Sequence, residues 1–299
     1  MTSSNSHLQP GVWGVLATPF DGPDGRIDFE SFVRQIELYR DVGAKGVVAL
    51  GVFGEASKLT PTEQREVVDA TASSAGELGV VIGVTALSTA PAIAQAASAV
   101  EVLGEALNGV MVLANSSNPA IVAAHFRAIH EATGTGIVIQ DYPKSSGVRL
   151  STPAAIDIIA SCPFAVAMKA EAPPTAQAIA DLTAATDVPV FGGLGGVGLL
   201  DELAAGAAGA MTGFSHPEGL IAAVDAFRTS GFAAAHEAYA RWLPVANFEA
   251  QEGAALAIRK AILHQRGIIR DPATRQPAGR FPEQLRGTMM AHLGALGTG

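Results

Sequence analysis

Short apolar runs alternate with longer helix-like segments along most of the 299-residue chain, and this alternation repeats eight times. The runs are rich in Val and Ile and lack interspersed polar residues, which is typical of parallel strands buried on both faces. Eight strand–helix units favour a closed (β/α)8 TIM barrel over a doubly wound sheet, which usually has fewer units and a switch point. The expected strands are residues 11–20, 46–51, 79–85, 109–114, 136–143, 165–170, 189–196 and 209–214.

Helix start signals support this reading of the intervening segments. Asp28, Thr60 and either Ser151 or Thr152 stand where an N-cap residue is expected, followed by an early proline or acid. Glycines close several of these segments, as helix C-termini favour. They are Gly43, Gly76, Gly104, Gly134 and Gly206.

The end of the chain carries helix patterns only. We therefore expect a polar leader at residues 1–10, a barrel at 11–222 and a helical extension at 223–299. Three prolines within residues 268–282 predict a loop between the last helices.

Composition narrows the classes of function. Hydrophobic residues make up 48% of the chain and charged residues 16%, enough for a sizeable core. The net charge is −9 and no run of Lys or Arg is present, which argues against nucleic acid or an anionic membrane as partner. The N-terminus resembles no signal peptide and no segment is apolar enough to span a membrane, so we expect a cytoplasmic protein. The lone Cys162 predicts a buried thiol, and the seven histidines show no metal-ligand spacing, so no metal or cofactor is expected.

One lysine stands out from its surroundings. The run Ala165–Met168 ends in Lys169, near the carboxyl end of the sixth strand, where barrel enzymes hold their active sites. Desolvation disfavours the ammonium form and leaves a free amine that attacks carbonyl groups. The alternative is a structural lysine that pairs with Glu171 on the same side of the strand.

Several segments together resemble the dihydrodipicolinate synthase/N-acetylneuraminate lyase family of class I, Schiff-base-forming lyases. They are LATPF (16–20), GVFGEASKLTPTEQREV (51–67), AVAMKAEA (165–172) and GAAGAMTGF (206–214). The resemblance covers about residues 11 to 290. It implies a barrel enzyme without cofactor, an imine on Lys169 with a 2-oxo acid substrate, and a homotetramer in which subunits complete each other's sites.

The fifth strand departs from the family pattern. Gln140 stands where the family has a proton-shuttling tyrosine, and Asp141 where it has an asparagine. Tyr142 shares a strand face with Gln140, so it is an alternative source of a phenol. Ser145, with Lys144 beside it, replaces the arginine that grips the second substrate of dihydrodipicolinate synthase. This loss disfavours the biosynthetic synthase.

Hydroxyl groups are also lost from two loops. Val52 and Phe53 replace two threonines after the second strand, although the backbone amides of Gly51–Glu55 still form a candidate carboxylate nest. The segment 114–119 supplies Asn115, Ser116 and Ser117 in place of a relay tyrosine.

Two branches of the family share features with this chain. The strand-five Ile-Gln-Asp, the strand-eight Gly-Ala-Met-Thr-Gly and residues 240–253 resemble the 2-keto-3-deoxy sugar-acid dehydratases. Phe53 resembles the loop of hydratase-aldolases that act on arylidene-pyruvates. The resemblance leaves the particular 2-oxo acid open.

The expected reaction begins with imine formation at C2 of the substrate, followed by loss of a C3 proton or cleavage of C3–C4. The candidate bases are Tyr142, a water held by Gln140, and Glu171. The substrate carboxylate is expected on the amides of Val52, Phe53 and Gly54 and on Gly192–Gly193. Glu55 either binds substrate or ties its own loop together, and Asn247, Glu249 and Glu252 are expected to be solvated or capping residues.

Three other functions compete with a lyase. A condensing synthase of the dihydrodipicolinate type joins pyruvate to an aldehyde. A phosphosugar barrel enzyme fits the glycine-rich seventh and eighth strands, but Pro217 removes one phosphate-binding amide. A non-catalytic 2-oxo acid binder fits the lost hydroxyls but leaves the buried amine of Lys169 without a task.

Overall fold

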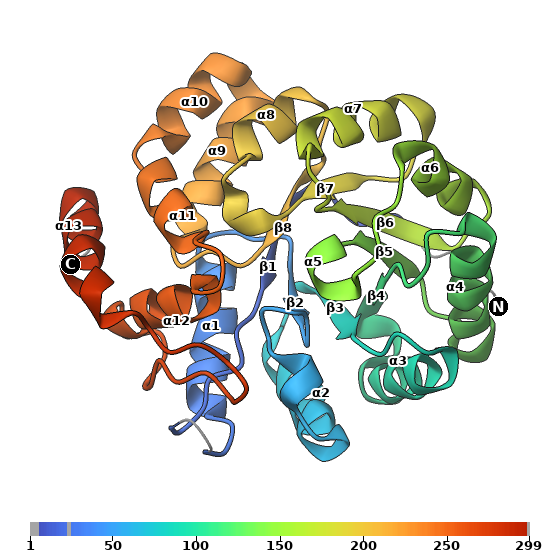
Figure 1. Cartoon of the computed structure of the whole chain (residues 1–299), viewed down its shortest axis with the longest axis horizontal. Helices are drawn as coiled ribbons and strands as arrows, with labels where there is room; N and C mark the ends of the chain where they lie inside the picture. Colours follow the sequence, from blue (N-terminus) through green and yellow to red (C-terminus); the bar gives the residue numbers. More distant parts are fainter. Residues whose placement is uncertain (1–5, 23–24, 298–299) are drawn as a thin grey trace.

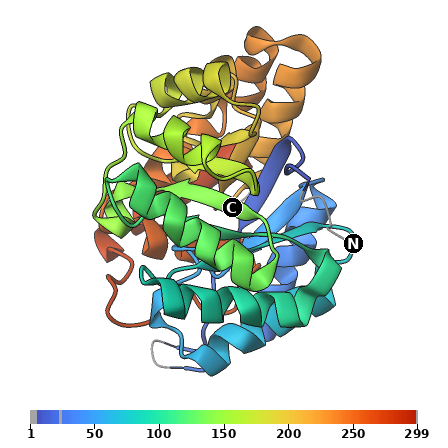
Figure 2. The same ribbon diagram turned by 90° about the vertical axis from the view of Figure 1, so that its right-hand side faces the viewer.

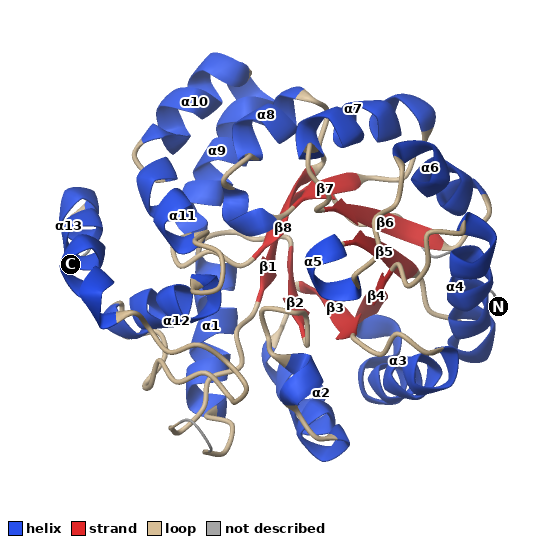
Figure 3. Ribbon diagram, viewed as in Figure 1, coloured by secondary structure: helices blue, strands red, loops and turns tan. Residues whose placement is uncertain are grey.

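The computed structural model describes residues 6–22 and 25–297, so the first five residues of the predicted polar leader lie outside the described residues. Eight parallel strands form a closed barrel in sequence order, with β8 paired to β1 (Figures 1 and 3). The prediction of a (β/α)8 barrel is thus confirmed. The strands are β1 Gly11–Val15, β2 Gly46–Ala49, β3 Gly79–Val84, β4 Leu107–Leu113, β5 Ile137–Asp141, β6 Ala165–Ala170, β7 Val190–Gly192 and β8 Gly209–Thr212.

Helices surround the barrel, and the predicted caps are observed. Asp28 and Ser151 each accept a backbone N–H at a helix start, and Thr60 forms a reciprocal capping box with Glu63. The surrounding helices are α1 Phe29–Asp41, α2 Pro61–Ser74, α3 Thr89–Leu103, α4 Pro119–Thr133, α6 Thr152–Ala160, α7 Thr175–Ala185, α8 Leu199–Ala204 and α9 Pro217–Ser230. Figure 2 shows α3, α4 and α6 along one flank of the barrel.

The core has two layers, because strand residues face alternately into the barrel and toward the helices. The interior layer includes Trp13, Val138, Ala167 and Phe191, whereas Met168 and Ala170 belong to the layer beneath the helices. The single cysteine, Cys162, is buried as predicted, and burial raises the pKa of its thiol to about 11.

The C-terminal extension packs against one side of the barrel, on the left in Figure 1. It consists of α10 Phe232–Ala240, α11 Leu243–Glu249, α12 Ala255–Gln265 and α13 Arg286–Leu296. The predicted loop of residues 268–282 is confirmed. The predicted boundary at residue 222 falls within α9, and we propose that the division between barrel and extension lies after this helix. In the described ranges, no helix combines the length and the apolar character that crossing a membrane requires.

Candidate active site

Lys169 points into the barrel at the carboxyl end of β6. Its neighbour Ala167 belongs to the interior layer, and residues two apart share a strand face. Only 5% of Lys169 is exposed. The register places Lys169 beside Gln140 of β5 and Phe191 of β7. The structure places Lys169 within the barrel and at the carboxyl end of its strand, as predicted.

A carboxylate and an amide accompany the lysine. The Lys169 Nζ lies 3.3 Å from Glu171 Oε2, and the Gln140 Nε2 donates to the same oxygen over 2.7 Å. All three side chains are buried, and all three face the interior. Pairing with Glu171, foreseen as the structural alternative, is present. It also gives the amine a base at the distance of one proton transfer.

Tyr142 lies two residues beyond Gln140, directly after β5, and is the N-cap residue of the short helix α5 (Pro143–Ser146). This helix lies in front of the strand ends in Figure 1. The side chain is half-buried. Burial, together with the negative charge of Glu171, raises the pKa of the Tyr142 phenol. The residue is therefore a proton donor at neutral pH and a poor base.

The loop after β2 is held by a hydrogen bond of 2.6 Å from Thr18 Oγ1 to the Gly54 carbonyl. Within the described residues, no group accepts a hydrogen bond from the amides of Val52, Phe53 or Gly54. Gly51 stands at the start of this loop, beside Val15 and Met111 of the interior. The loop thus keeps free donors of the kind that a carboxylate nest needs.

Glu55 is engaged elsewhere. Its carboxylate accepts from Lys260 Nζ at 2.6 Å, from Lys58 Nζ at 2.9 Å and from the Arg275 amide at 3.0 Å. Both oxygens therefore serve to join the β2 loop to the C-terminal extension. This geometry supports the interpretation in which Glu55 ties its own loop and does not bind substrate.

The two glycines after Phe191 face opposite ways. A Cβ on Gly193 would lie 2.5 Å from Glu171 Oε1, so this backbone borders the interior group. A Cβ on Gly192 would instead lie 1.8 Å from Glu202 Oε2, on the helix side of the strand. Of the two glycines predicted to bind the substrate carboxylate, only Gly193 borders Glu171.

Arg259, for which no role was predicted, lies above Phe53. The guanidinium carbon is 4.8 Å from the Phe53 ring centre, and Arg259 Nε donates to Glu249 Oε2 over 2.9 Å. Only 8% of Arg259 is exposed. The signal in the sequence was the pair Arg259-Lys260 between the apolar positions of a helix pattern, which is a costly placement for two cations.

The expectation that Glu249 is solvated or capping is wrong. The residue is fully buried, and its carboxylate accepts from Arg259 and from the Ser215 backbone amide. Burial raises its pKa, and the charge of Arg259 opposes this rise. Asn247 and Glu252 are exposed as predicted, and Glu252 pairs with Lys144 at 3.2 Å.

Two further acids lie on the outer side of the strands. Asp141 borders a cavity of about 170 Å³ behind β5 and β6, and burial raises its pKa to about 6. Glu202 of α8 accepts from Thr175 Oγ1 over 2.7 Å, and burial raises its pKa to about 7. One oxygen of each carboxyl group has no hydrogen-bond partner in the described structure. Neither acid faces the barrel interior, where Lys169 lies.

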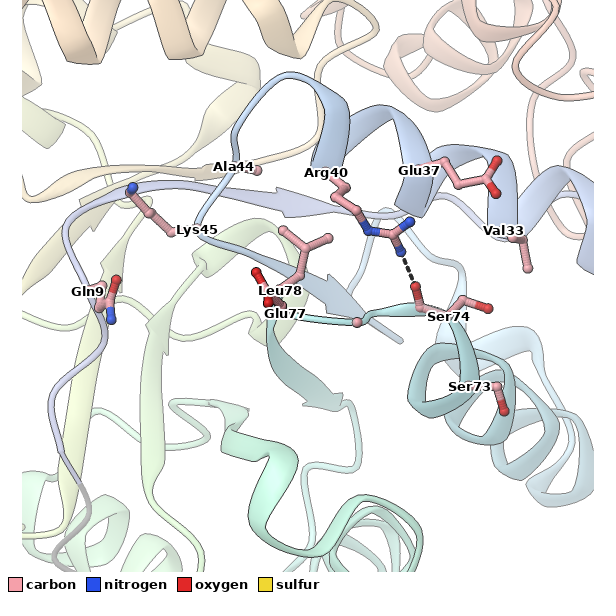
Figure 4. Close-up of a pocket in the computed structure, with 11 residues that line it drawn as sticks. Gln9, Val33, Glu37, Arg40, Ala44, Lys45, Ser73, Ser74, Glu77 and Leu78 are labelled. Atoms are coloured by element: carbon pink, nitrogen blue, oxygen red, sulfur yellow. Dashed lines mark hydrogen bonds between the residues drawn. The ribbon is translucent and has the colours of Figure 1, made fainter.

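A hollow lies at the opposite end of the barrel, shown in Figure 4. It measures about 850 Å³ and is bordered by the ends of α1 and α2, where Arg40 donates to the Ser74 carbonyl. Lys45 and Glu77 lie at its edge, ahead of β2 and β3. Barrel enzymes hold their chemistry at the carboxyl end of the strands, so this hollow does not mark the active site.

A closed barrel with a buried, carboxylate-paired lysine at the carboxyl end of its strands is typical of enzymes that use imine chemistry. Comparison with known proteins identifies the family. The chain matches the Dihydrodipicolinate synthetase family over residues 9–296, and it belongs to that family. The resemblance predicted from four short motifs is thus confirmed across the barrel and the extension.

Individual relatives agree with this assignment. An L-2-keto-3-deoxyarabonate dehydratase of Azospirillum brasilense is 28% identical, with 97% of this chain and 96% of the relative covered. A 4-hydroxy-tetrahydrodipicolinate synthase of Prochlorococcus marinus is 29% identical, with 76% and 77% covered. The crystal structure of a dihydrodipicolinate synthase from Rhodopseudomonas palustris superposes with a TM-score of 0.89 at 28% identity, covering 97% of this chain and 99% of that one.

No group of three or more His, Cys, Asp or Glu side chains that could hold a metal ion occurs among the described residues. The polar groups at the carboxyl end of the barrel include an amine, an amide, a phenol, a carboxylate and the Arg259 guanidinium. Side chains of these kinds can transfer protons, and an amine can form an imine with a carbonyl group.

Proposed function

We propose that this chain is a Schiff-base-forming lyase that acts on a 2-oxo acid through an imine on Lys169. The observation that carries the proposal is the buried Lys169 Nζ at 3.3 Å from Glu171, on the inner wall of a barrel of this family. A buried amine beside a single carboxylate gains little from a purely structural role, because desolvation offsets much of the ion-pair energy.

The first half of the reaction forms the imine. Glu171 takes a proton from the Lys169 ammonium, and the free Nζ attacks the C2 carbonyl of the substrate. The resulting carbinolamine loses its hydroxyl group as water, with the proton returned by Glu171. The C=N bond that replaces the C=O bond is protonated, and it draws electrons from C3.

The second half breaks a bond at C3. Loss of a C3 proton gives an enamine, and the enamine expels the C4 hydroxyl; cleavage of C3–C4 uses the same electron sink. Glu171 is the base that best fits the geometry, since Gln140 orients it at 2.7 Å. Tyr142, whose pKa is raised by burial, is suited to protonate the departing hydroxyl.

The substrate carboxylate is assigned to the amides of Val52, Phe53 and Gly54 after β2 and to the Gly193 segment. Free amide donors in a tight loop bind anions without a charged side chain. This suits a chain with a net charge of −9, where long-range attraction of an anion is weak.

Dehydration is favoured over condensation. Ser145 offers no cation to a second carboxylate, and the neighbouring Lys144 is paired with Glu252 on the surface. A non-catalytic binder is disfavoured because it gains nothing from Lys169.

Borohydride trapping tests the proposal. The protein is incubated separately with pyruvate, a 2-keto-3-deoxy sugar acid and an arylidene-pyruvate, and the reduced adduct is located by peptide mass analysis. We expect an adduct on Lys169 that Lys169→Ala abolishes, and dehydrated product from the sugar acid. Full turnover by Lys169→Ala would show that the imine mechanism is wrong.

We further propose a homotetramer, as the family resemblance implies. The family also contains a dihydrodipicolinate synthase variant described as monomeric, so the state of this chain needs measurement. Light scattering after size-exclusion chromatography gives it directly: a mass of four chains is expected, and a mass of one chain contradicts the proposal. The cytoplasmic location stays a prediction from the sequence.

A further inference from the structure

Arg259 is a cation that the helical extension brings to the active-site end of the barrel. It comes from α12, is 8% exposed and donates from Nε to Glu249 Oε2 over 2.9 Å. In the described part of the chain, this is the only hydrogen bond of its side chain. Arginine carries N–H donors on all three guanidinium nitrogens, so both terminal nitrogens keep donors without an acceptor.

These terminal donors are fixed in place. A Cβ on Gly195 would lie 2.8 Å from Arg259 Nη2, so the guanidinium rests against the loop that follows β7. On its other side it covers the Phe53 ring at 4.8 Å. Rigid and largely desolvated donors with no internal partner are what a polar ligand group requires.

The Phe53 ring is in contact with Arg259 and with the backbone that follows β8. A Cβ on Gly213 would lie 2.5 Å from the Phe53 ring, which therefore packs on the backbone after β8, while Arg259 covers the ring from above. An aromatic substrate needs a free ring face for stacking. Phe53 therefore acts as a support for the arginine, and its presence does not indicate an aromatic substrate.

The spacing along the β7 loop relates Arg259 to the lysine. Gly193 borders Glu171, and Gly195, two residues further on, borders Arg259 Nη2. Two residues of chain reach at most roughly 7 Å. Pyruvate ends at C3, next to the imine carbon, whereas a longer 2-oxo acid extends toward the far side of the same loop.

We propose that Arg259 is a specificity-determining residue that binds oxygen atoms at the far end of the substrate. The inference rests on the proposed imine function and narrows its substrate class to extended 2-oxo acids with oxygen-bearing tails. Glu249 balances the charge of Arg259, so hydroxyl oxygens are accepted as well as a carboxylate. Arylidene-pyruvates lack such a tail.

The test uses imine formation, so it does not depend on which bond is later broken. The concentration of acid that half-saturates borohydride adduct formation on Lys169 is measured for four probes: pyruvate, 2-oxoglutarate, a 2-keto-3-deoxy pentonate and benzylidene-pyruvate. The variant is Arg259→Lys, which keeps the charge opposite Glu249 but loses the planar fork. Arg241→Lys is the matched control, because Arg241 also stacks on an aromatic ring, Trp242 at 4.9 Å, within the extension.

For Arg259→Lys we expect the half-saturating concentration of at least one oxygen-tailed acid to rise on the order of 10- to 100-fold. Pyruvate and benzylidene-pyruvate should keep their wild-type values, and Arg241→Lys should change none of the four. An equal rise for pyruvate and the longer acids would overturn the proposal, as would no rise with any probe. No adduct with any probe in the wild-type protein would instead reject the imine function itself.

Phe53→Leu gives an independent readout that leaves the Arg259–Glu249 pair intact. If Phe53 supports the arginine, this variant weakens binding of the oxygen-tailed acids more than binding of benzylidene-pyruvate. If the ring stacks on the substrate, benzylidene-pyruvate suffers most and the proposal is wrong.

Discussion

Two buried lysines in this molecule have opposite surroundings. Lys169 of β6 faces the barrel interior, 5% exposed, with Glu171 at 3.3 Å as its ion-pair partner. Lys260 of α12 is fully buried, with Glu55 at 2.6 Å and the Ala273 carbonyl at 2.8 Å, and it lies over the Phe20 ring. Lys260, the more deeply buried lysine, thus has the shorter and more numerous polar contacts.

The difference shows that burial alone does not mark a reactive amine. The short contacts of Lys260 are made to groups that fix the β2 loop and residues 268–282 to the extension, and they leave no room for a carbonyl compound. Lys169 has a longer contact to one carboxylate and lies where barrel substrates enter. A reactive amine needs both desolvation and space beside its nitrogen for a carbonyl compound.

Substituting Lys169 should give the largest effect on activity. Lys169→Met should lower turnover by roughly 10³-fold or more, because no other group supplies the amine. Its unfolding free energy should change less than that of Lys260→Met, since Glu171 keeps the hydrogen bond from Gln140. Initial-rate kinetics and urea unfolding of the same preparation check both statements; wild-type turnover would remove the distinction between the two lysines.

Substituting Lys260 should have the converse outcome. Lys260→Met leaves the buried Glu55 without its shortest contact, and we expect a loss of about 3 kcal/mol in unfolding free energy. Urea denaturation measures it, with Lys45→Met, an exposed lysine at the opposite end, as control. The double variant Lys260→Met/Glu55→Gln should regain part of the loss. Stability unchanged by Lys260→Met would contradict a structural role.

A third experiment concerns Glu202, a buried acid on the outer side of the strands. Burial raises the pKa of Glu202 from 4.5 to about 7, so the folded protein holds a proton there that the unfolded chain releases. The stability from this proton is complete below pH 4.5 and is lost as the pH rises toward 7. Glu202→Gln should flatten this part of the pH–stability curve, by at most about 3 kcal/mol. Equal slopes for variant and wild type would show that Glu202 is ionised when folded.

The smallest effect is expected from a paired but exposed lysine. Lys144 contacts Glu252 at 3.2 Å, and both side chains are largely in solvent. Lys144→Ala should change the unfolding free energy by less than about 1 kcal/mol, because surface ion pairs are weak. Thermal unfolding at low and high salt checks this, and a larger salt-dependent loss would mean that the pair holds α5 over the barrel.

Much of the fold was predictable because its signals are local. Continuous Val- and Ile-rich runs gave all eight strands, and the caps at Asp28, Thr60 and Ser151 gave helix starts. Lys169 was found because a cation at the end of an apolar strand is costly without a task. The shared face of Lys169 and Glu171, and that of Gln140 and Tyr142, also follow from strand periodicity.

The rest of the site depends on contacts between distant parts of the chain. Lys260 meets Glu55 across 205 positions, and Arg259 reaches Phe53 from a helix that local patterns place only in an extension. Glu249 was misjudged because a helix pattern gives one residue's face but not the neighbour that covers it.

The barrel, its family and the position of the lysine could be predicted from consecutive residues, since periodicity and strand ends are local properties. The packing of the extension decided which charges are buried, which carboxylates are already bonded and where Arg259 keeps donors free. Those outcomes depend on desolvation and partner geometry, and these exist only once the helices lie against the barrel.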